Sequence, residues 1–327
     1  VSGMWGVATL CGPAIGGIFA QTGHWRLAFW ALLPVAAALA LIVTFKVGGR
    51  SSVPPAPPSP LPLGTLALLV ASVLAITLAS LSTNLAGNLA GIAGGLAIAT
   101  LIARVDSRAD RRLLPTGAYS IRTPLGALYA VMCLVVAAIT TEIFVPYFLQ
   151  VIHRLSPLAA GYMTAAMAAG WTLAAMPSAT RTGAAADRLV RLSPAVILAS
   201  LIGLAIMTPQ TAVLSSLAGL AAYIVALAGV GFGIGLAWPH LLTRIFNAAP
   251  KGEETLTSSS ITTVQLYASA VTAALAGVVT NSAGLADPGG VEGAQQAARW
   301  LFAAFAAAPA LALLLLGRVT RATAGRH

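Results

Sequence analysis

Apolar runs of about 20 residues, separated by short polar segments, dominate the chain. The runs cover residues 1–21, 27–45, 62–83, 85–103, 124–149, 157–180, 193–209, 214–242, 256–281 and 300–317. A helix needs about 20 apolar residues to cross the hydrocarbon core of a bilayer, whereas the tilted strand of a membrane barrel needs only about 10. The pattern therefore predicts an all-α integral membrane protein with about ten transmembrane helices.

The composition agrees with a membrane protein and argues against a soluble one. Of the 327 residues, 58% are hydrophobic and 8% are charged, and the mean hydropathy is +0.89. Too few polar side chains are available to cover a soluble surface. The net charge of +10 does not indicate nucleic-acid binding, because the basic residues form short clusters between apolar runs without interleaved aromatic residues.

The basic residues alternate between the segments that connect the apolar runs. Arg26, Arg154 and Arg299 fall on one side, and the remaining 15 of the 18 Lys and Arg residues fall on the other. Cytoplasmic loops carry the excess of Lys and Arg in multi-pass membrane proteins. We expect a cell-membrane protein whose two chain ends, as given, are cytoplasmic.

Two breaks in the apolar pattern divide the chain. The segment SSVPPAPPSPLP favours an extended polyproline conformation and reads as a cytoplasmic linker, and RVDSRADRRLLPTGAYSIRTP is a basic loop. The resulting segments are two helices at 1–46, the linker at 47–61, a helix pair at 62–104, the basic loop at 105–123, six helices at 124–318 and a tail at 319–327.

Motifs for catalysis and metal binding are not found in the sequence. Cys11 and Cys133 are far apart, which fits neither a disulfide framework nor a metal site. No serine with a histidine partner in the membrane, no pair of membrane aspartates and no phosphate-binding loop is present. We expect no enzyme activity, no cofactor and no metal.

Small residues recur at every fourth position of the first run and form a smooth stripe at Ala8, Gly12, Gly16 and Ala20. Pro13 lacks an N–H and permits a bend in this helix. The run at 157–180 carries the same spacing at Gly161, Ala165 and Ala169. Because small residues let membrane helices approach closely, we predict that these two runs pack together, although chance alone also places alanines four residues apart in so alanine-rich a chain.

The sequence GPAIGG, followed by HWRLAFWALLP, resembles the fifth and sixth helices of drug:proton antiporters of the major facilitator superfamily. Gly12, Pro13, Gly16 and Gly17 match the antiporter signature of that family. The segments PYFLQVIHRLSPLAAGYM, GIGLAWPHL and TTVQLYASAVTAALAGVV are similar to its fourteen-helix branch. In GAAADRLVR, Gly183, Asp187, Arg188 and Arg191 match the family's basic loop, with Val190 in place of a glycine.

The resemblance implies a partial N-terminal bundle, an inserted helix pair and a complete six-helix C-terminal bundle built from two inverted repeats. It begins at the family's fifth helix, so we expect the chain to lack the first four helices. The implied function is export of amphiphilic, drug-like small molecules in exchange for protons, by alternating access. The implied partners are the substrate, protons and the lipid bilayer, the energy source is the proton gradient, and a monomer is expected.

Glu142 is the one charge of the chain that falls inside an apolar run. A carboxylate at that depth is costly and normally faces a cavity or a partner, so it is a candidate for proton coupling or substrate recognition. The alternative is a carboxylate that reaches external water or bonds a neighbouring helix. Tyr147, Gln265 and Tyr267 are further candidates for the cavity, although a hydrogen bond between helices is the simpler role for Gln265 and Tyr267.

Two other functions fit the same sequence. A transporter of this fold can be dedicated to one metabolite or antibiotic, in which case unrelated compounds would not compete for export. A truncated membrane protein that transports nothing is the other alternative. Four further membrane helices encoded upstream, one of them bearing an acidic residue, would favour the antiporter.

Overall fold

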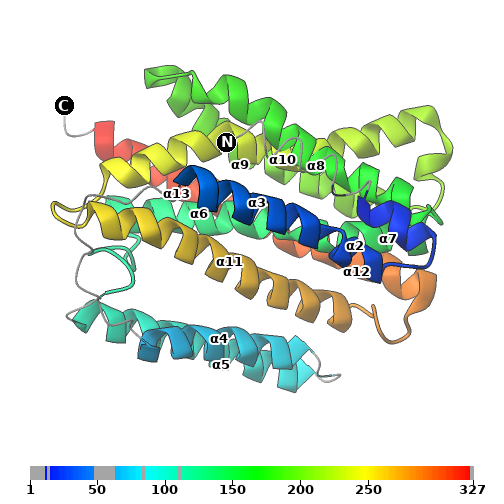
Figure 1. The fold of residues 1–327 in the computed structure, drawn as a ribbon, viewed down its shortest axis with the longest axis horizontal. Helices are drawn as coiled ribbons and strands as arrows, with labels where there is room; N and C mark the ends of the chain where they lie inside the picture. The colour runs from blue at the N-terminus through cyan, green and yellow to red at the C-terminus, as the bar shows by residue number, and fades with distance from the viewer. Residues whose placement is uncertain are drawn as a thin grey trace.

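The computed structural model describes residues 12, 15–47, 63–80, 82, 85–109 and 112–324, and these residues form helices joined by short connections (Figure 1). Residues 15–21 are helical. The other helices are α2 (Arg26–Trp30), α3 (Leu32–Val47), α4 (Leu63–Ser80), α5 (Leu85–Arg108), α6 (Pro124–Thr140), the 3-10 helix η1 (Thr141–Phe144), α7 (Val145–Val151), α8 (Pro157–Ala179), α9 (Gly183–Met207), the 3-10 helix η2 (Val213–Ser215), α10 (Leu217–Asn247), α11 (Glu254–Ser282), α12 (Gly290–Phe305) and α13 (Ala307–Ala324).

Eight helical segments within the described residues are long and apolar enough to cross a membrane. They cover residues 26–46, 63–80, 86–108, 124–151, 183–207, 217–247, 254–282 and 290–316. The predicted span at 157–180 forms α8 inside the bundle but is not among the eight. The predicted span at 1–21 lies mostly outside the described residues. The predicted all-α membrane fold is confirmed.

Several helices of the bundle begin where the sequence supplies a capping side chain. Thr123, Ser156 and Ser216 precede α6, α8 and α10, and each side-chain oxygen accepts a hydrogen bond from a backbone N–H of the first turn. Pro124 and Pro157 occupy the first positions of α6 and α8, where the missing N–H costs no hydrogen bond. These local signals fix where the membrane helices start.

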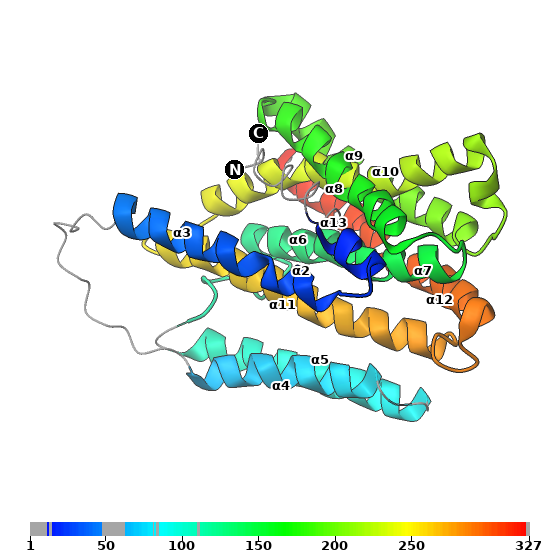
Figure 2. The same ribbon diagram turned by 45° about the vertical axis from the view of Figure 1, so that its right-hand side comes forward.

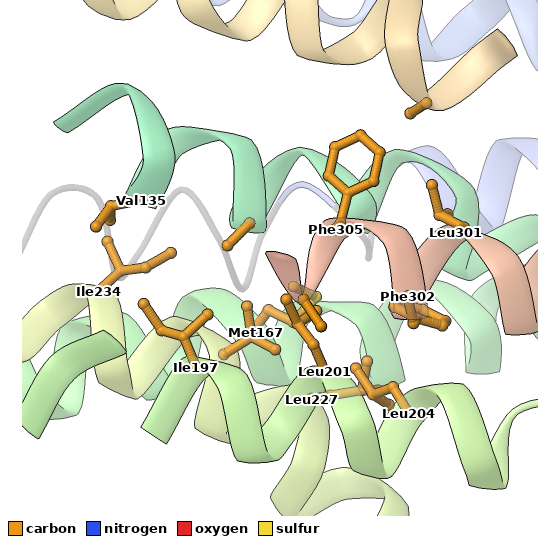
Figure 3. Packing of buried hydrophobic residues seen from close by; sticks show 14 of the residues in the cluster. Val135, Met167, Ile197, Leu201, Leu204, Leu227, Ile234, Leu301, Phe302 and Phe305 are labelled. Carbon is orange, nitrogen blue, oxygen red and sulfur yellow. The ribbon is translucent and has the colours of Figure 1, made fainter. Parts of the chain in front are cut away.

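The largest core of the molecule lies within the bundle formed by α6 to α13. Figure 3 shows the middle of this core, where side chains of α6, α8, α9, α10 and α12 meet. Its fully buried members include Met167 of α8, Leu201 of α9, Leu227 of α10 and Phe302 of α12. These helices therefore form one packed unit.

Glycines allow α8 and α10 to pack backbone against backbone. A Cβ added at Gly170 would lie 2.8 Å from the carbonyl carbon of Ala228, and one added at Gly231 would lie 2.6 Å from that of Met167. Carbon atoms in ordinary contact are about 3.5–4.0 Å apart. The two helices therefore approach each other more closely than any residue larger than glycine permits at these positions.

Helices α4 and α5 form a hairpin at the edge of the molecule and lie along α11 (Figures 1 and 2). Gly95 of α5 faces Ile76 of α4, where an added Cβ would meet the Ile76 Cδ1 atom at 2.8 Å. The hydroxyl of Tyr267 in α11 is 2.7 Å from that of Ser72 in α4, and Asn281 Nδ2 donates to the backbone oxygen of Ser80 at 2.7 Å. Polar contacts spaced along α11 thus attach the hairpin to the bundle.

Helix α3 has a different environment. None of the residues in the apolar window at 26–46 is buried. Helix α2 is the element against which α3 packs most extensively within the described residues. The apolar side chains of α3 are therefore available to lipid or to another helix.

Candidate functional site

The first membrane span of the bundle is interrupted at Glu142. Helix α6 ends at Thr140, η1 carries Glu142, and α7 begins at Val145. Pro146 has no N–H to donate to the backbone oxygen of Glu142, and Val145 N–H donates to that oxygen instead, in the tighter 3-10 pattern. Interrupted membrane helices are typical of transporter binding sites.

The side chain of Glu142 is partly buried and has no hydrogen bond or ion pair to another described residue. Helices α11 and α12 pack against η1. Close by, the hydroxyls of Thr140 and Thr272 are 2.9 Å apart and join α6 to α11. A carboxylate in this setting lacks the protein partner that would neutralise it, so it is chemically free to bind a proton or a cation.

The structure does not gather the four predicted cavity residues into one site. Tyr147 lies on α7, one turn beyond Glu142, and its ring packs edge-on against Phe148 at 6.0 Å. Gln265 is partly buried on α11, about 10 Å along the helix from Thr272, which lies beside the interruption.

Tyr267 belongs to a different contact. The Ser72 hydroxyl donates to the backbone oxygen of Leu69, so the Tyr267 hydroxyl donates to Ser72 and joins α11 to the α4–α5 hairpin. The simpler role of a hydrogen bond between helices is therefore the one observed for Tyr267, and a contact of Tyr267 with a transported substrate stays a prediction.

The glycine motif contacts α8 at one point. A Cβ added at Gly17 would lie 2.7 Å from Cδ1 and 2.9 Å from Cα of Leu158 at the start of α8. At Gly12 and Gly16 an added Cβ would meet nothing within 4 Å. The first run therefore contacts α8, as predicted, but through Gly17 and not through Gly12 and Gly16 of the stripe. Pro13 lies outside the described residues.

The residues matched to the family's basic loop are helical in the structure. Gly183, Asp187, Arg188 and Arg191 all lie in the first turns of α9, because a helix can continue beyond the apolar stretch into the polar region. Asp187 forms an ion pair with Arg244 near the end of α10. The side chains of Arg188 and Arg191 are exposed.

His240 of α10, one turn before Arg244, is buried. It is 8% exposed, and its Nε2 atom lies 3.0 Å from the hydroxyl of Ser178 in α8. That hydroxyl donates to the backbone oxygen of Leu236 at 2.7 Å, so the Nε2–H of His240 is the donor to Ser178. The missed signal is that α10 continues to Asn247 and keeps residue 240 on its buried face.

The connection between α5 and α6 folds around Asp106, which is fully buried at the end of α5. Its carboxylate accepts hydrogen bonds from the backbone N–H groups of Leu113 at 2.7 Å and Leu114 at 3.1 Å, and from the hydroxyl of Tyr119 at 2.9 Å. Burial, followed by the charge of Asp106, raises the pKa of Tyr119, which therefore stays protonated and donates. Sequence reasoning missed this cluster because Asp106 stands among arginines.

A second acid holds the same connection to the bundle. Glu253, just before α11, accepts hydrogen bonds at 2.6 Å from both the backbone N–H and the hydroxyl of Thr116, and Arg112 donates to that hydroxyl at 2.7 Å. The hydrogen bonds from Thr116 lower the pKa of Glu253. This contact and the Asp187–Arg244 pair bring the α5–α6, α8–α9 and α10–α11 connections together at one end of the bundle, which we call the basic end.

No group of three or more His, Cys, Asp and Glu side chains within the described residues is arranged to hold a metal ion. The arrangement instead offers an unpaired acid at a helix interruption and a network of polar contacts at the basic end.

Comparison with known proteins places this architecture in a family. Residues 1–273 match the family model that is described as Major Facilitator Superfamily. Two probable multidrug-efflux transporters of Mycobacterium tuberculosis, from strains CDC 1551 and H37Rv, are each 34% identical over 312 residues, which cover 93% of this chain and 64% of the relative. An MFS thioclapurine efflux transporter of Claviceps purpurea is 50% identical over 46 residues, which cover 14% of this chain and 8% of that protein. The chain thus spans less than two thirds of the length of the mycobacterial relatives. It is a helical membrane protein that belongs to the major facilitator superfamily, a family of transporters and not of enzymes.

Proposed function

We propose that this chain forms part of an exporter that moves amphiphilic, drug-like molecules across the cell membrane in exchange for protons. The names of the mycobacterial relatives support multidrug efflux. The glycine motif of the antiporter branch, matched by Gly12, Pro13, Gly16 and Gly17, supports proton antiport. The basic end would face the cytoplasm, in keeping with the excess of positive charge in cytoplasmic loops.

The observation that carries the proton step is the environment of Glu142. Its carboxylate is partly buried, lies where the span is interrupted and has no partner among the described residues. A proton and a cationic or amphiphilic substrate can compete for such a group, and this competition couples proton entry to substrate exit. Tyr147, one turn away, and Gln265 on α11 would offer aromatic and polar contacts to the substrate.

Transport by the complete gene product in inside-out membrane vesicles tests this proposal. An imposed proton gradient should drive uptake of ethidium, and adding ethidium should dissipate the gradient. The Glu142→Gln variant should lose proton-driven uptake and its pH dependence. Glu292→Gln, which makes the same chemical change at an exposed acid of α12, is the matched control and should transport normally.

Competition among chemically unrelated amphiphiles separates multidrug export from a dedicated exporter. A multidrug site gives mutual inhibition by several of them, whereas a dedicated site gives none. Proton-driven uptake by Glu142→Gln with unchanged pH dependence would refute the role of Glu142. The absence of gradient-driven transport for every compound in a folded wild-type protein would refute the transport proposal itself.

A further inference from the structure

A cavity of about 270 Å³ lies between the α4–α5 hairpin, the α5–α6 connection and the bundle helices α6 and α11. Its walls are mainly apolar, with Leu69 from α4, Ile102 from α5, Cys133 from α6 and Val264 from α11. Pockets that enclose drug-sized ligands measure about 300–1,000 Å³. The cavity is therefore better suited to a slender apolar chain than to a bulky compound.

The tyrosine hydroxyls of the cavity wall do not need a hydrogen bond from a ligand. Tyr119, Tyr129 and Tyr267 all line the cavity. The hydroxyls of Tyr119 and Tyr267 are bonded as described above, and that of Tyr129 lies 2.6 Å from the Ser260 hydroxyl. Because protein partners satisfy these hydroxyls, the tyrosines offer their rings to an occupant, and rings favour contact with an alkyl chain.

The cavity lies close to the level at which the apolar runs of its helices end, at the basic end. Leu69, Tyr129 and Thr263 lie five to seven residues inside the runs at 62–83, 124–149 and 256–281, and Ile102 lies one residue inside the run at 85–103. At 1.5 Å per residue, these positions are about 2–11 Å from the ends of the runs. The headgroups of a bilayer meet the outer parts of the acyl chains at this level.

Positive charge lies directly beside the cavity. Arg108 and Arg112 line an open hollow of about 590 Å³ on the surface of the same connection, together with Glu253. Arg112 borders this hollow and the next residue, Leu113, borders the cavity, so the two sites are one residue apart along the chain. Among the residues that line this hollow, two guanidinium groups stand against one carboxylate, whereas the carboxylate of Asp106 in the same connection is fully buried and already accepts three hydrogen bonds. The surface of the hollow is therefore positively charged, which attracts an anionic headgroup.

We propose that this junction binds an anionic phospholipid, with one acyl chain in the cavity and the phosphate at Arg108 and Arg112. The α4–α5 hairpin lies along α11 at the edge of the molecule (Figure 2), and residues of both line the cavity. It is separate from the Glu142 interruption, so lipid binding here does not depend on what the protein transports. A bound lipid would fill the gap in packing between the hairpin and the bundle.

Native mass spectrometry of the complete protein with dioleoyl phosphatidylglycerol and dioleoyl phosphatidylcholine tests this proposal. Phosphatidylglycerol should bind more tightly. Arg108→Gln should weaken phosphatidylglycerol binding about fivefold and leave phosphatidylcholine binding nearly unchanged, since a basic residue near a membrane contributes about a factor of five to the binding of acidic lipid. Arg181→Gln removes the same charge from the α8–α9 connection and should have little effect.

The acyl-chain half of the site is tested on α5. Ala99 lines the cavity, whereas Ala97 is exposed on the same helix. Ala99→Trp should reduce the binding of both lipids and Ala97→Trp should not. Ala99→Leu adds less volume and replaces Ala99→Trp if the larger variant fails to fold.

Two results would overturn the proposal. One is equal binding of the two lipids by the wild type, with no selective effect of Arg108→Gln. The other is unchanged lipid binding in a folded Ala99 variant, including the case in which that variant loses binding of a transported compound, which would make the cavity a substrate site.

Discussion

Replacing Gly231 with alanine tests the close packing of α8 and α10. The added Cβ would lie 2.6 Å from the carbonyl carbon of Met167 and 3.0 Å from the backbone nitrogen of Trp171. Both contacts are to backbone, which cannot rotate away as a side chain can. The atom nearest to the added Cβ is the backbone oxygen of Met167, so the helices would have to separate by more than about 1 Å to restore ordinary contact distances.

The cost follows from that separation. Overpacking a core costs about 1–3 kcal/mol, and the upper end applies because the clash is with backbone. Alanine is favoured over glycine in a helix by about 1 kcal/mol. The net loss of stability is about 2 kcal/mol, or roughly 3 °C in melting temperature, by the scaling of unfolding entropy with length for globular proteins applied to 327 residues.

Thermal unfolding of the purified protein in detergent measures this change, with Gly203→Ala on α9 as the matched control. At Gly203 an added Cβ would make ordinary contacts, at 3.6 Å to Met207 Cε and 3.8 Å to Ala226 Cβ. We expect Gly203→Ala to be neutral or slightly stabilising. Equal melting temperatures for Gly231→Ala and Gly203→Ala would refute the close approach of the two helices.

Three further predictions concern contacts outside this core. Lowering the pH below about 4, the ordinary range of a glutamate, should open the contact of Glu253 with the α5–α6 connection. Its folded-state pKa is lowered, so its contribution is present at neutral pH and is lost as the pH falls through that pKa. Hydrogen exchange of the connection measures this, and Glu253→Gln should remove the pH dependence. A double-mutant cycle of Ser72→Ala and Tyr267→Phe should give a coupling energy of about 0.6 kcal/mol in thermal unfolding, whereas strictly additive effects would contradict the hydrogen bond. Gly17→Leu should weaken the contact with α8, whereas Gly16→Leu should not. Slower disulfide trapping between the two helices, or a lower melting temperature, measures this change.

The positions of the membrane helices could be predicted from the sequence because hydropathy reports which residues suit lipid. The ends of those helices could not. Helix α9 begins at Gly183, ten residues before the predicted start at 193, because helical geometry continues through Asp187 and Arg188 after the apolar stretch has ended. A hydropathy pattern marks the edge of the bilayer, whereas the helix ends where its backbone hydrogen bonds end.

Helix partners were harder to predict than helices. A four-residue spacing of small residues identifies a smooth face but not the helix that covers it. The stripe at Gly12 and Gly16 has no neighbour at the predicted place, whereas Gly231 of α10, which the stripe analysis did not single out, meets the backbone of α8. Many alanine-rich faces in this chain are compatible with one another, so the choice among them depends on the three-dimensional path of the whole chain.

The acidic residues show most clearly why a site requires the structure. Glu142 stands alone in an apolar run, which singled it out as a candidate but left open whether it faces a cavity, external water or a neighbouring helix, and in the structure it has no partner among the described residues. Asp106 stands among arginines, which favours a solvated side chain, yet it is fully buried and accepts hydrogen bonds from two backbone amides and a tyrosine. Backbone donors carry no signature in the sequence, because every residue except proline supplies one. The burial of an acid therefore does not decide its role. Asp106 has its donors and holds a connection in place, whereas Glu142 has no partner among the described residues, and its proposed role in proton exchange rests on that difference.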